Sequence, residues 1–271
     1  MKSSESNNNL VFDYHTIRLL IGLIALSFPW VVSIRAYRIT PSISWSYYTD
    51  ARDLFVGLLF VIGAFLISYK GHKLVLHKND VGIFWNWVSK FWKGAINFRI
   101  RERKHEESLV GLTGGIAAWV TAMYPTAFCV EKNCPSDPTS LIHYIGAFIL
   151  FSTTVYFCLV AFKGRVNAKI KDEGSDEKGG NDPKIIRIRF YSFCGWGIVA
   201  IMLGSVIVSY AQFDAIPNLT FWAEAAALEL FGIAWLIASQ YLPIVTDKKE
   251  QQKLFKTAND KTTKHAQATA E

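Results

Sequence analysis

The feature that most constrains this chain is the placement of its positive charge around six apolar stretches. These stretches divide the sequence into seven polar segments, and 25 of the 29 Lys and Arg residues lie in every second segment. Nine of them fall within 70–107, eight within 163–189 and six after Leu242, whereas the segment 211–220 has none. Because membrane insertion retains Lys- and Arg-rich loops in the cytoplasm, the alternation predicts a topology with both termini on the cytoplasmic side.

The lengths of the apolar stretches predict membrane-spanning helices. The hydrocarbon core of a bilayer is about 30 Å thick and requires roughly 20 apolar residues of helix. The predicted spans take up nearly half of the chain, which leaves no room for a separate soluble domain. We therefore expect an all-α polytopic membrane protein with six transmembrane helices, at 17–34, 51–69, 108–125, 141–162, 190–210 and 221–242.

Polar regions complete the predicted organisation around a single bundle over residues 17–245. Residues 1–16 are expected to be a disordered cytoplasmic N-terminus, and residues 246–271 a cytoplasmic tail rich in Lys, Thr and Gln. The segment 163–189 contains a run of Asp, Glu, Gly and Ser and is expected to be a flexible cytoplasmic loop. The net charge of +7 follows from segments that face anionic lipid headgroups, so nucleic-acid binding is not expected.

The second cytoplasmic segment contains an amphipathic stretch at about 83–98. Its aromatic residues recur with a helical period on one face, while Lys90 and Lys93 fall on the opposite face. Such a stretch is too polar to span a membrane and favours a helix lying in the headgroup layer. An anchor for the bundle and a recognition element for anionic lipid both stay open. The residues expected to enter the membrane surface are Trp85, Trp87, Phe91 and Trp92.

Two of the four cysteines lie in a loop that the charge rule places outside the cytoplasm. In an oxidising compartment such as a periplasm, Cys129 and Cys134 could close a short disulfide worth roughly 2 kcal/mol by loop entropy. A pair of unlinked thiols is the alternative. Cys158 and Cys194 lie within predicted spans and are expected to pack as small apolar residues.

Ionisable side chains in the predicted spans mark the candidate functional site, because such groups are costly inside a bilayer. At the start of the second span, Asp50 and Asp53 share a face with Gly57, Ala64 and Ser68. The small and polar character of this face predicts that it points into the bundle. Arg52 lies on another side of the same helix, where its side chain can extend toward the outside.

The fourth and sixth predicted spans add ionisable groups at a similar depth. His143 lies on a small and polar face of the fourth span. Glu229 shares its face of the sixth span with Ala225 and Gly232, which suits close contact between helices. These observations predict a polar cavity that opens to the outside, with the candidate residues Asp50, Arg52, Asp53, His143, Glu224 and Glu229.

Three interpretations of this set of residues stay open. It is a buried polar network that sets helix register, a pocket that binds or moves a small solute or ion, or a metal-dependent lipid hydrolase or transferase. In the third case the metal ligands would be Asp50, Asp53, His143 and Glu224, with one position left for water. The sequence contains no Gly-x-Ser-x-Gly, His-Glu-x-x-His, P-loop or Cys-x-x-Cys motif. We therefore favour a non-enzymatic role without a cofactor, in solute binding or in organising a membrane complex.

The third predicted span carries a stripe of small residues. Gly111 and Gly115 have small-xxx-small spacing, and Ala118 and Ala122 continue the same face. Small residues let two membrane helices approach closely. Such a stripe packs helices within one bundle more often than it forms a dimer, so internal packing is expected and a homo-oligomer is left open.

Two sequence motifs carry a resemblance to a group of known proteins. In 44–71 an aromatic Ser/Tyr segment leads into an Ala-Arg-Asp helix start and ends at Tyr-Lys-Gly, and 114–126 ends in Tyr-Pro-Thr. Together these motifs resemble an uncharacterised family of small bacterial multi-pass inner-membrane proteins of unknown function. The resemblance implies the bacterial cell inner membrane and implies no specific activity. Ceramidase-like membrane hydrolases hold zinc with several histidines, and His143 is alone in the predicted spans, which counts against that class.

Overall fold

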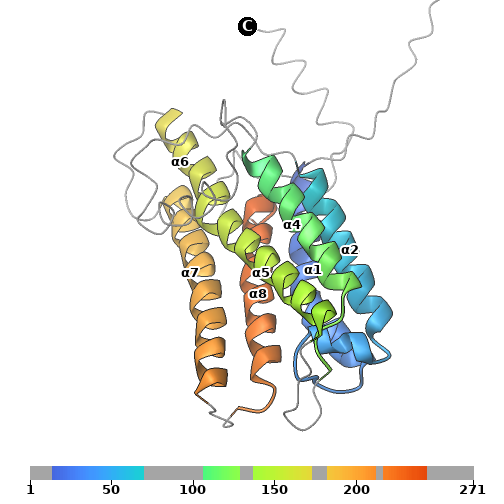
Figure 1. The fold of residues 1–271 in the computed structure, drawn as a ribbon. Coiled ribbons are helices and arrows are strands. Elements are labelled where there is room, and N and C mark those ends of the chain that lie inside the picture. Colours follow the sequence, from blue (N-terminus) through green and yellow to red (C-terminus); the bar gives the residue numbers. More distant parts are fainter. Residues whose placement is uncertain (1–13, 70–105, 129–136, 173–181, 212–215, 243–271) are drawn as a thin grey trace, which may run out of the picture.

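Helices account for the regular structure of this protein wherever its computed structural model describes the chain, which is at residues 14–69, 106–128, 137–172, 182–211 and 216–242. They form an elongated bundle (Figure 1). The all-α prediction is therefore confirmed. The helices are α1 (Tyr14–Arg35), α2 (Arg52–Ser68), α4 (Glu106–Met123), α5 (Pro138–Tyr156), α6 (Lys163–Asp172), α7 (Pro183–Tyr210) and α8 (Leu219–Ser239), with a short 3₁₀ helix η1 (Ser44–Tyr48) and a π-helix η2 (Phe157–Phe162).

Several helix ends follow from local sequence signals. An Asp-Pro pair begins both α5 and α7, where the proline takes the first helical position and the aspartate caps the helix. The Asp182 carboxylate accepts a hydrogen bond of 2.8 Å from the backbone N–H of Lys184. At its other end, α8 stops at Gln240, which has a left-handed backbone with φ of 62°.

α5, η2 and α6 form one continuous helix over Pro138–Lys171, 34 residues long. The prediction of a flexible loop at 163–189 is therefore wrong for 163–172, which form α6, and for 183–189, which begin α7. Lys, Arg and Ala are good helix formers, so a helix can continue beyond the point where its apolar stretch ends. The wider turn of a π-helix such as η2 shifts the residues that follow it around the helix axis.

Within the part of the chain that the structure describes, four helices are long and apolar enough to cross a membrane, namely His15–Arg35, Pro138–Lys171, Pro183–Ser209 and Leu219–Ser239. α2 is shorter, with 17 residues, and the apolar part of α4 is limited to Leu109–Met123. Several long apolar helices in one chain identify a multi-pass membrane protein.

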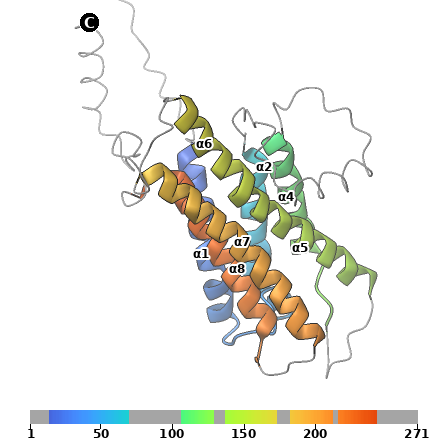
Figure 2. The same ribbon diagram turned by 90° about the vertical axis from the view of Figure 1, so that its left-hand side faces the viewer.

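The first and last of the described helices are neighbours. α1 packs most extensively on α8, and α2 packs on α4 (Figures 1 and 2). A Cβ atom added to Gly22 of α1 would lie 3.0 Å from the carbonyl oxygen of Gly232 of α8. A Cβ atom added to Gly115 of α4 would lie 2.5 Å from the carbonyl oxygen of Gly63 of α2. The small-residue stripe of α4 therefore serves internal packing, as predicted.

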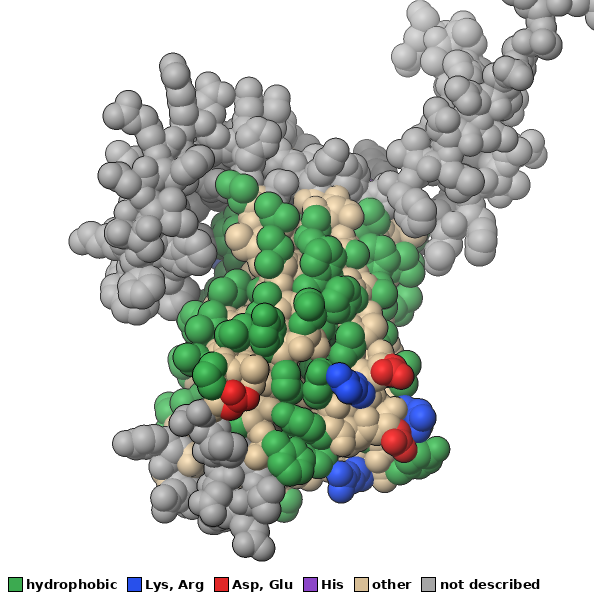
Figure 3. All heavy atoms as spheres, turned by 45° about the vertical axis from the view of Figure 1, so that its right-hand side comes forward, with side chains coloured by type: hydrophobic (Ala, Val, Ile, Leu, Met, Phe, Trp, Pro, Cys, Tyr) green, Lys and Arg blue, Asp and Glu red, His purple; other side chains and the backbone are tan. Residues whose placement is uncertain are grey.

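The bundle has two ends that differ in composition. We call the end that holds the start of α1, the end of α2, α6, the start of α7 and the end of α8 the basic end, and the opposite end, which holds η1, the η1 end. Figure 3 shows one face of the molecule, with hydrophobic side chains across the middle and charged side chains toward the η1 end.

Several predicted features lie outside the described residues. These are the surface helix at 83–98 with Trp85, Trp87, Phe91 and Trp92, the Cys129–Cys134 disulfide, and most of the two terminal regions. The other two cysteines, Cys158 and Cys194, are buried free thiols within helices, which confirms their predicted role in packing.

Candidate functional site

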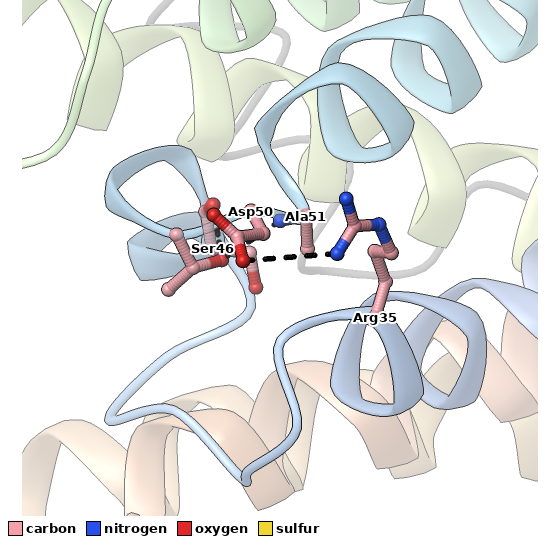
Figure 4. Close-up of polar contacts among 5 residues, drawn as sticks. Arg35, Ser46, Asp50 and Ala51 are labelled. Carbon is pink, nitrogen blue, oxygen red and sulfur yellow. Dashed lines mark hydrogen bonds and ion pairs between the residues drawn. The ribbon is translucent and has the colours of Figure 1, made fainter.

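An ion pair lies at the surface of the η1 end, where α1 ends and α2 begins. Nη1 of Arg35 is 3.7 Å from Oδ2 of Asp50, and both side chains are exposed (Figure 4). The Thr49 hydroxyl beside this pair accepts a hydrogen bond of 3.1 Å from the backbone N–H of Ala51. An exposed pair of this kind contributes about 0–1 kcal/mol of stability, so Asp50 serves here as a surface contact.

Arg52 and Asp53 line an open cavity between α2 and α4. The guanidinium of Arg52 lies 4.3 Å from the centroid of the Tyr47 ring and donates a hydrogen bond of 2.7 Å to the Tyr47 hydroxyl. The cavity has a volume of about 450 Å³. Its lining comes from η1, α2 and α4, through Tyr47, Arg52, Asp53, Val56, Gly57, Ala122 and Met123.

The predicted inward orientation of the Asp53 face of α2 is wrong. Asp53, Gly57, Ala64 and Ser68 are exposed. In a membrane helix apolar residues occupy both faces, so small residues do not by themselves identify the interior side. The buried residues of α2 are instead Phe55, Leu59, Ile62, Gly63 and Leu66. The backbone at Gly63 and Leu66 lies against the glycine stripe of α4.

His143 of α5 is 2% exposed, which confirms that its face points inward. Its Nδ1–H donates a hydrogen bond of 2.7 Å to the carbonyl oxygen of Tyr124, just beyond α4. Two residues further on, the backbone carbonyl oxygen of Thr126 accepts a hydrogen bond of 2.6 Å from the hydroxyl of Tyr48. Burial raises the pKa of that hydroxyl above its usual value. These contacts join α5, the end of α4 and η1.

The two glutamates of α8 contact different parts of the chain. Oε2 of Glu224 accepts a hydrogen bond of 2.6 Å from the backbone N–H of Ile43, in the loop before η1. Oε1 of Glu229 accepts one of 2.6 Å from the indole Nε1–H of Trp30 on α1. Both contacts tie α8 to the first third of the chain, as a polar network that sets helix register would do.

The structure therefore separates the six predicted residues at the η1 end. Arg52 and Asp53 share a cavity, Asp50 pairs with Arg35, and the other three hold separate helix contacts. Within the described ranges, no three His, Cys, Asp or Glu side chains lie close enough together to hold a metal ion. The metal ligands considered from the sequence are thus not brought together there, namely Asp50, Asp53, His143 and Glu224.

A second polar cluster, not predicted from the sequence, lies at the basic end. Arg18 of α1 is 7% exposed and Arg187 of α7 is 1% exposed. Arg18 donates hydrogen bonds of 3.1 Å to the carbonyl oxygen of Ala238 and 3.3 Å to the hydroxyl of Tyr69. The guanidinium of Arg165 also lies over the Tyr69 ring, 5.2 Å from its centroid.

Aromatic rings form the inner wall of this cluster. The Trp235 ring centroid lies 5.3 Å from that of Tyr69, 5.2 Å from that of Phe157 and 5.1 Å from that of Phe162. Phe162 in turn lies 5.4 Å from Tyr191, centroid to centroid. Tyr191 and Arg187 are both buried on α7, at 2% and 1% exposed.

A sequence signal for the cluster exists in α7. Lys184, Arg187, Tyr191, Cys194 and Ile198 recur at spacings of three and four residues, and all five are buried. This apolar and basic face begins before the predicted span at 190–210, so a search confined to that span could not find it.

Comparison with known proteins finds no match to the chain among protein-family models, curated proteins or solved structures. The resemblance of 44–71 and 114–126 to small bacterial inner-membrane proteins is therefore not supported, and no family is identified.

Proposed function

We propose that the chain is a six-span protein of the bacterial inner membrane that binds a small polar solute at its η1 end. The charge alternation along the sequence supports an outward-facing η1 end and a cytoplasmic basic end. The 17 residues of α2 are at the lower limit for a spanning helix. Its close packing on α4 supports the passage of both helices through the membrane beside the four longer ones.

The main observation behind this proposal is that Arg52 and Asp53 line the same cavity. A guanidinium binds carboxylate or phosphate groups, and a carboxylate binds amines, so the pair suits a solute with both an acidic and an amino group. Tyr47 holds the Arg52 side chain through its ring and its hydroxyl. The volume of about 450 Å³ falls in the range of small-molecule sites.

In this proposal the remaining predicted residues have a supporting role. Glu224 holds the loop before η1, Glu229 holds α1, and His143 holds the end of α4. Together they keep η1 in position over the start of α2, which is where Tyr47 meets Arg52. No metal or cofactor is required for binding.

The test is calorimetric titration of the purified full chain in uncharged detergent with zwitterionic, anionic and cationic small solutes. We expect a zwitterion to bind, and both Arg52→Gln and Asp53→Asn to weaken its binding at least tenfold. Arg38→Gln is the matched control, because Arg38 is an exposed arginine at the same end that stacks on Trp45, at 5.0 Å from its ring centroid. Equal affinity in all four proteins would contradict the proposal.

A second test fills the cavity without touching its charges. A Cβ atom added at Gly57 would meet no atom within 4 Å, so Gly57→Leu should fit the fold while occupying the cavity. Gly204 of α7 has the same open surroundings and does not line the cavity. Solute binding should be lost in Gly57→Leu and kept in Gly204→Leu, and binding retained in both would exclude this cavity.

Organisation of a membrane complex is the second candidate, and the exposed face of α2 favours it. Gly57, Ala64 and Ser68 offer small side chains on the outside of the bundle, where another helix could approach closely. A second copy of the chain is the simplest partner. Disulfide cross-linking of Ala64→Cys in membranes should then give a dimer, with Leu203→Cys on exposed α7 as the control.

A further inference from the structure

The cavity at the η1 end presents two charges of opposite sign. Arg52 and Asp53 are consecutive residues at the start of α2, and both line the cavity with exposed side chains. Consecutive residues of a helix do not face each other, so the two charges stay apart. The Arg52 guanidinium lies over the Tyr47 ring, whereas Asp53 forms no ion pair within the described ranges. A ligand in the cavity can therefore place an anionic group at Arg52 and a cationic group at Asp53.

The apolar wall of the cavity continues along α2 and α4. It is formed by Val56, Gly57, Ala122 and Met123. About one turn further along both helices, the rings of Phe60 and Trp119 are stacked with their centroids 5.6 Å apart. The Trp119 indole also donates a hydrogen bond of 3.0 Å to the carbonyl oxygen of Phe60. The neighbouring apolar side chains of Val61 and Ile116 are exposed, and we call these four residues the α2–α4 seam. Apolar surface therefore leads away from the charged part of the cavity.

Aromatic residues place the charged part of the cavity at the depth of lipid headgroups. Trp45 and Tyr48 of η1 cluster with Phe128, at centroid distances of 5.8 and 5.0 Å. Trp and Tyr are enriched at the two interfaces between a membrane and water. The face in Figure 3 likewise has its charged side chains toward the η1 end and hydrophobic side chains across the middle. Arg52 and Asp53 thus lie at the level of headgroups, and the α2–α4 seam lies at the level of acyl chains.

We infer that the cavity holds the headgroup of a zwitterionic phospholipid, with an acyl chain lying along the α2–α4 seam. This inference rests on the zwitterion binding proposed above and names the chemical class of that zwitterion. The planar fork of the Arg52 guanidinium matches the oxygens of a phosphodiester. The Asp53 carboxylate accepts hydrogen bonds from a primary ammonium group. Phosphatidylethanolamine carries both groups in one headgroup.

The test is native mass spectrometry of the purified full chain in uncharged detergent, with equal amounts of phosphatidylethanolamine and phosphatidylglycerol, which lacks the amine. We expect the wild-type chain to retain phosphatidylethanolamine at least threefold more. Asp53→Asn should abolish this preference, and Arg52→Gln should lower the retention of both lipids. The matched controls Asp50→Asn and Arg38→Gln change exposed charges at the same end outside the cavity. Equal retention of the two lipids by the wild-type chain would overturn the inference, as would an unchanged preference in Asp53→Asn.

A second pair of variants tests the position of the acyl chain. Phe60→Ala removes a ring from the α2–α4 seam and keeps both charges of the cavity, so it should weaken phosphatidylethanolamine retention severalfold. Calorimetric binding of glycerophosphoethanolamine, the same headgroup without acyl chains, should be unchanged in this variant. Phe193→Ala is the control, because Phe193 is an exposed phenylalanine on α7. Wild-type lipid retention in Phe60→Ala would overturn the placement of the chain along the seam.

The same measurements separate this inference from the proposed function. Soluble zwitterions that bind through Arg52 and Asp53, without a preference for phosphatidylethanolamine, would overturn the inference and leave the proposed function standing. A wild-type chain that binds neither soluble zwitterions nor phosphatidylethanolamine would overturn both. Arg52 and Asp53 are exposed, so their variants should fold, and melting temperatures close to that of the wild-type chain check this.

Discussion

The two ends of the bundle hold charged side chains in opposite ways. At the η1 end, Arg35 and Arg52 are exposed and each contacts a single neighbour, Asp50 or Tyr47. At the basic end, Arg18 and Arg187 are buried, and the guanidinium groups of Arg18 and Arg165 both lie over the Tyr69 ring. The comparison shows that the arginines of the two ends differ in burial. The cost of a charge depends on whether neighbouring helices exclude water from it.

The two ends also differ in what orders them. Hydrogen bonds between a loop and α8 order the η1 end, since Ile43 and Phe221 both take part in loop-to-helix contacts. Ring packing between α2, η2, α7 and α8 orders the basic end. Substitutions at the two ends should therefore change the free energy of unfolding by different amounts. The variants below test this, from the largest expected change to the smallest.

Removal of Arg18 should have the largest effect. In Arg18→Ala, the Ala238 carbonyl oxygen and the Tyr69 hydroxyl lose their donor, and the Tyr69 ring loses a packing partner. We expect the free energy of unfolding to fall by about 3 kcal/mol, measured by denaturant titration in mixed micelles. Arg52→Ala at the η1 end should change it by about 0.5 kcal/mol or less. Equal losses in the two variants would remove the distinction between the ends.

Removal of the Glu224 carboxylate should have the next largest effect. Glu224→Ala leaves the backbone N–H of Ile43 without its acceptor and should cost about 2 kcal/mol of stability. Glu224→Gln keeps an acceptor oxygen, so we expect a loss of less than about 1 kcal/mol. If the glutamine variant were as unstable as the alanine variant, the negative charge itself would be the stabilising element.

The contact between Glu229 and Trp30 should contribute less, because the indole is partly exposed. A double-mutant cycle with Glu229→Ala and Trp30→Phe should give a coupling energy of about 1 kcal/mol. Melting temperatures of the four proteins in one detergent supply the measurement. Additive losses would show that the two side chains stabilise the bundle independently.

Removal of the Arg35–Asp50 ion pair should have the smallest effect on stability. Asp50→Ala should change stability by about 0.5 kcal/mol or less, and the change should shrink further at high salt. A loss above about 2 kcal/mol would place this pair with the buried contacts of the basic end.

The helices themselves could be predicted from the sequence, because apolar run length and Asp-Pro caps are local signals. The predicted start at 190 falls inside α7, which begins at Pro183, because Lys184 and Arg187 resemble loop residues in a hydropathy reading. The inward direction of His143 was also predictable, since its face combines glycine and threonine with the histidine.

The direction of the Asp53 face and the basic cluster could not be predicted in the same way. Lipid and protein interior are both apolar, so hydropathy does not distinguish them, and Gly57 lies outside while Gly63 lies inside. Arg18 and Arg165 meet at the Tyr69 ring, which depends on how α1 and α6 lie beside the end of α2. Residues that are 147 positions apart in the sequence leave no local signal of that arrangement.

The adjacency of α1 and α8 has a consequence for how the protein is made. α1 is synthesised before the other described helices, yet its main packing partner in the bundle is the last of them. During synthesis, Gly22 and Trp30 of α1 are therefore in the membrane before Gly232 and Glu229, their contacts on α8, have been inserted. A chain truncated before α8 would expose these surfaces of α1 to lipid and to quality-control proteases, so the folding of α1 is complete only once α8 has been inserted.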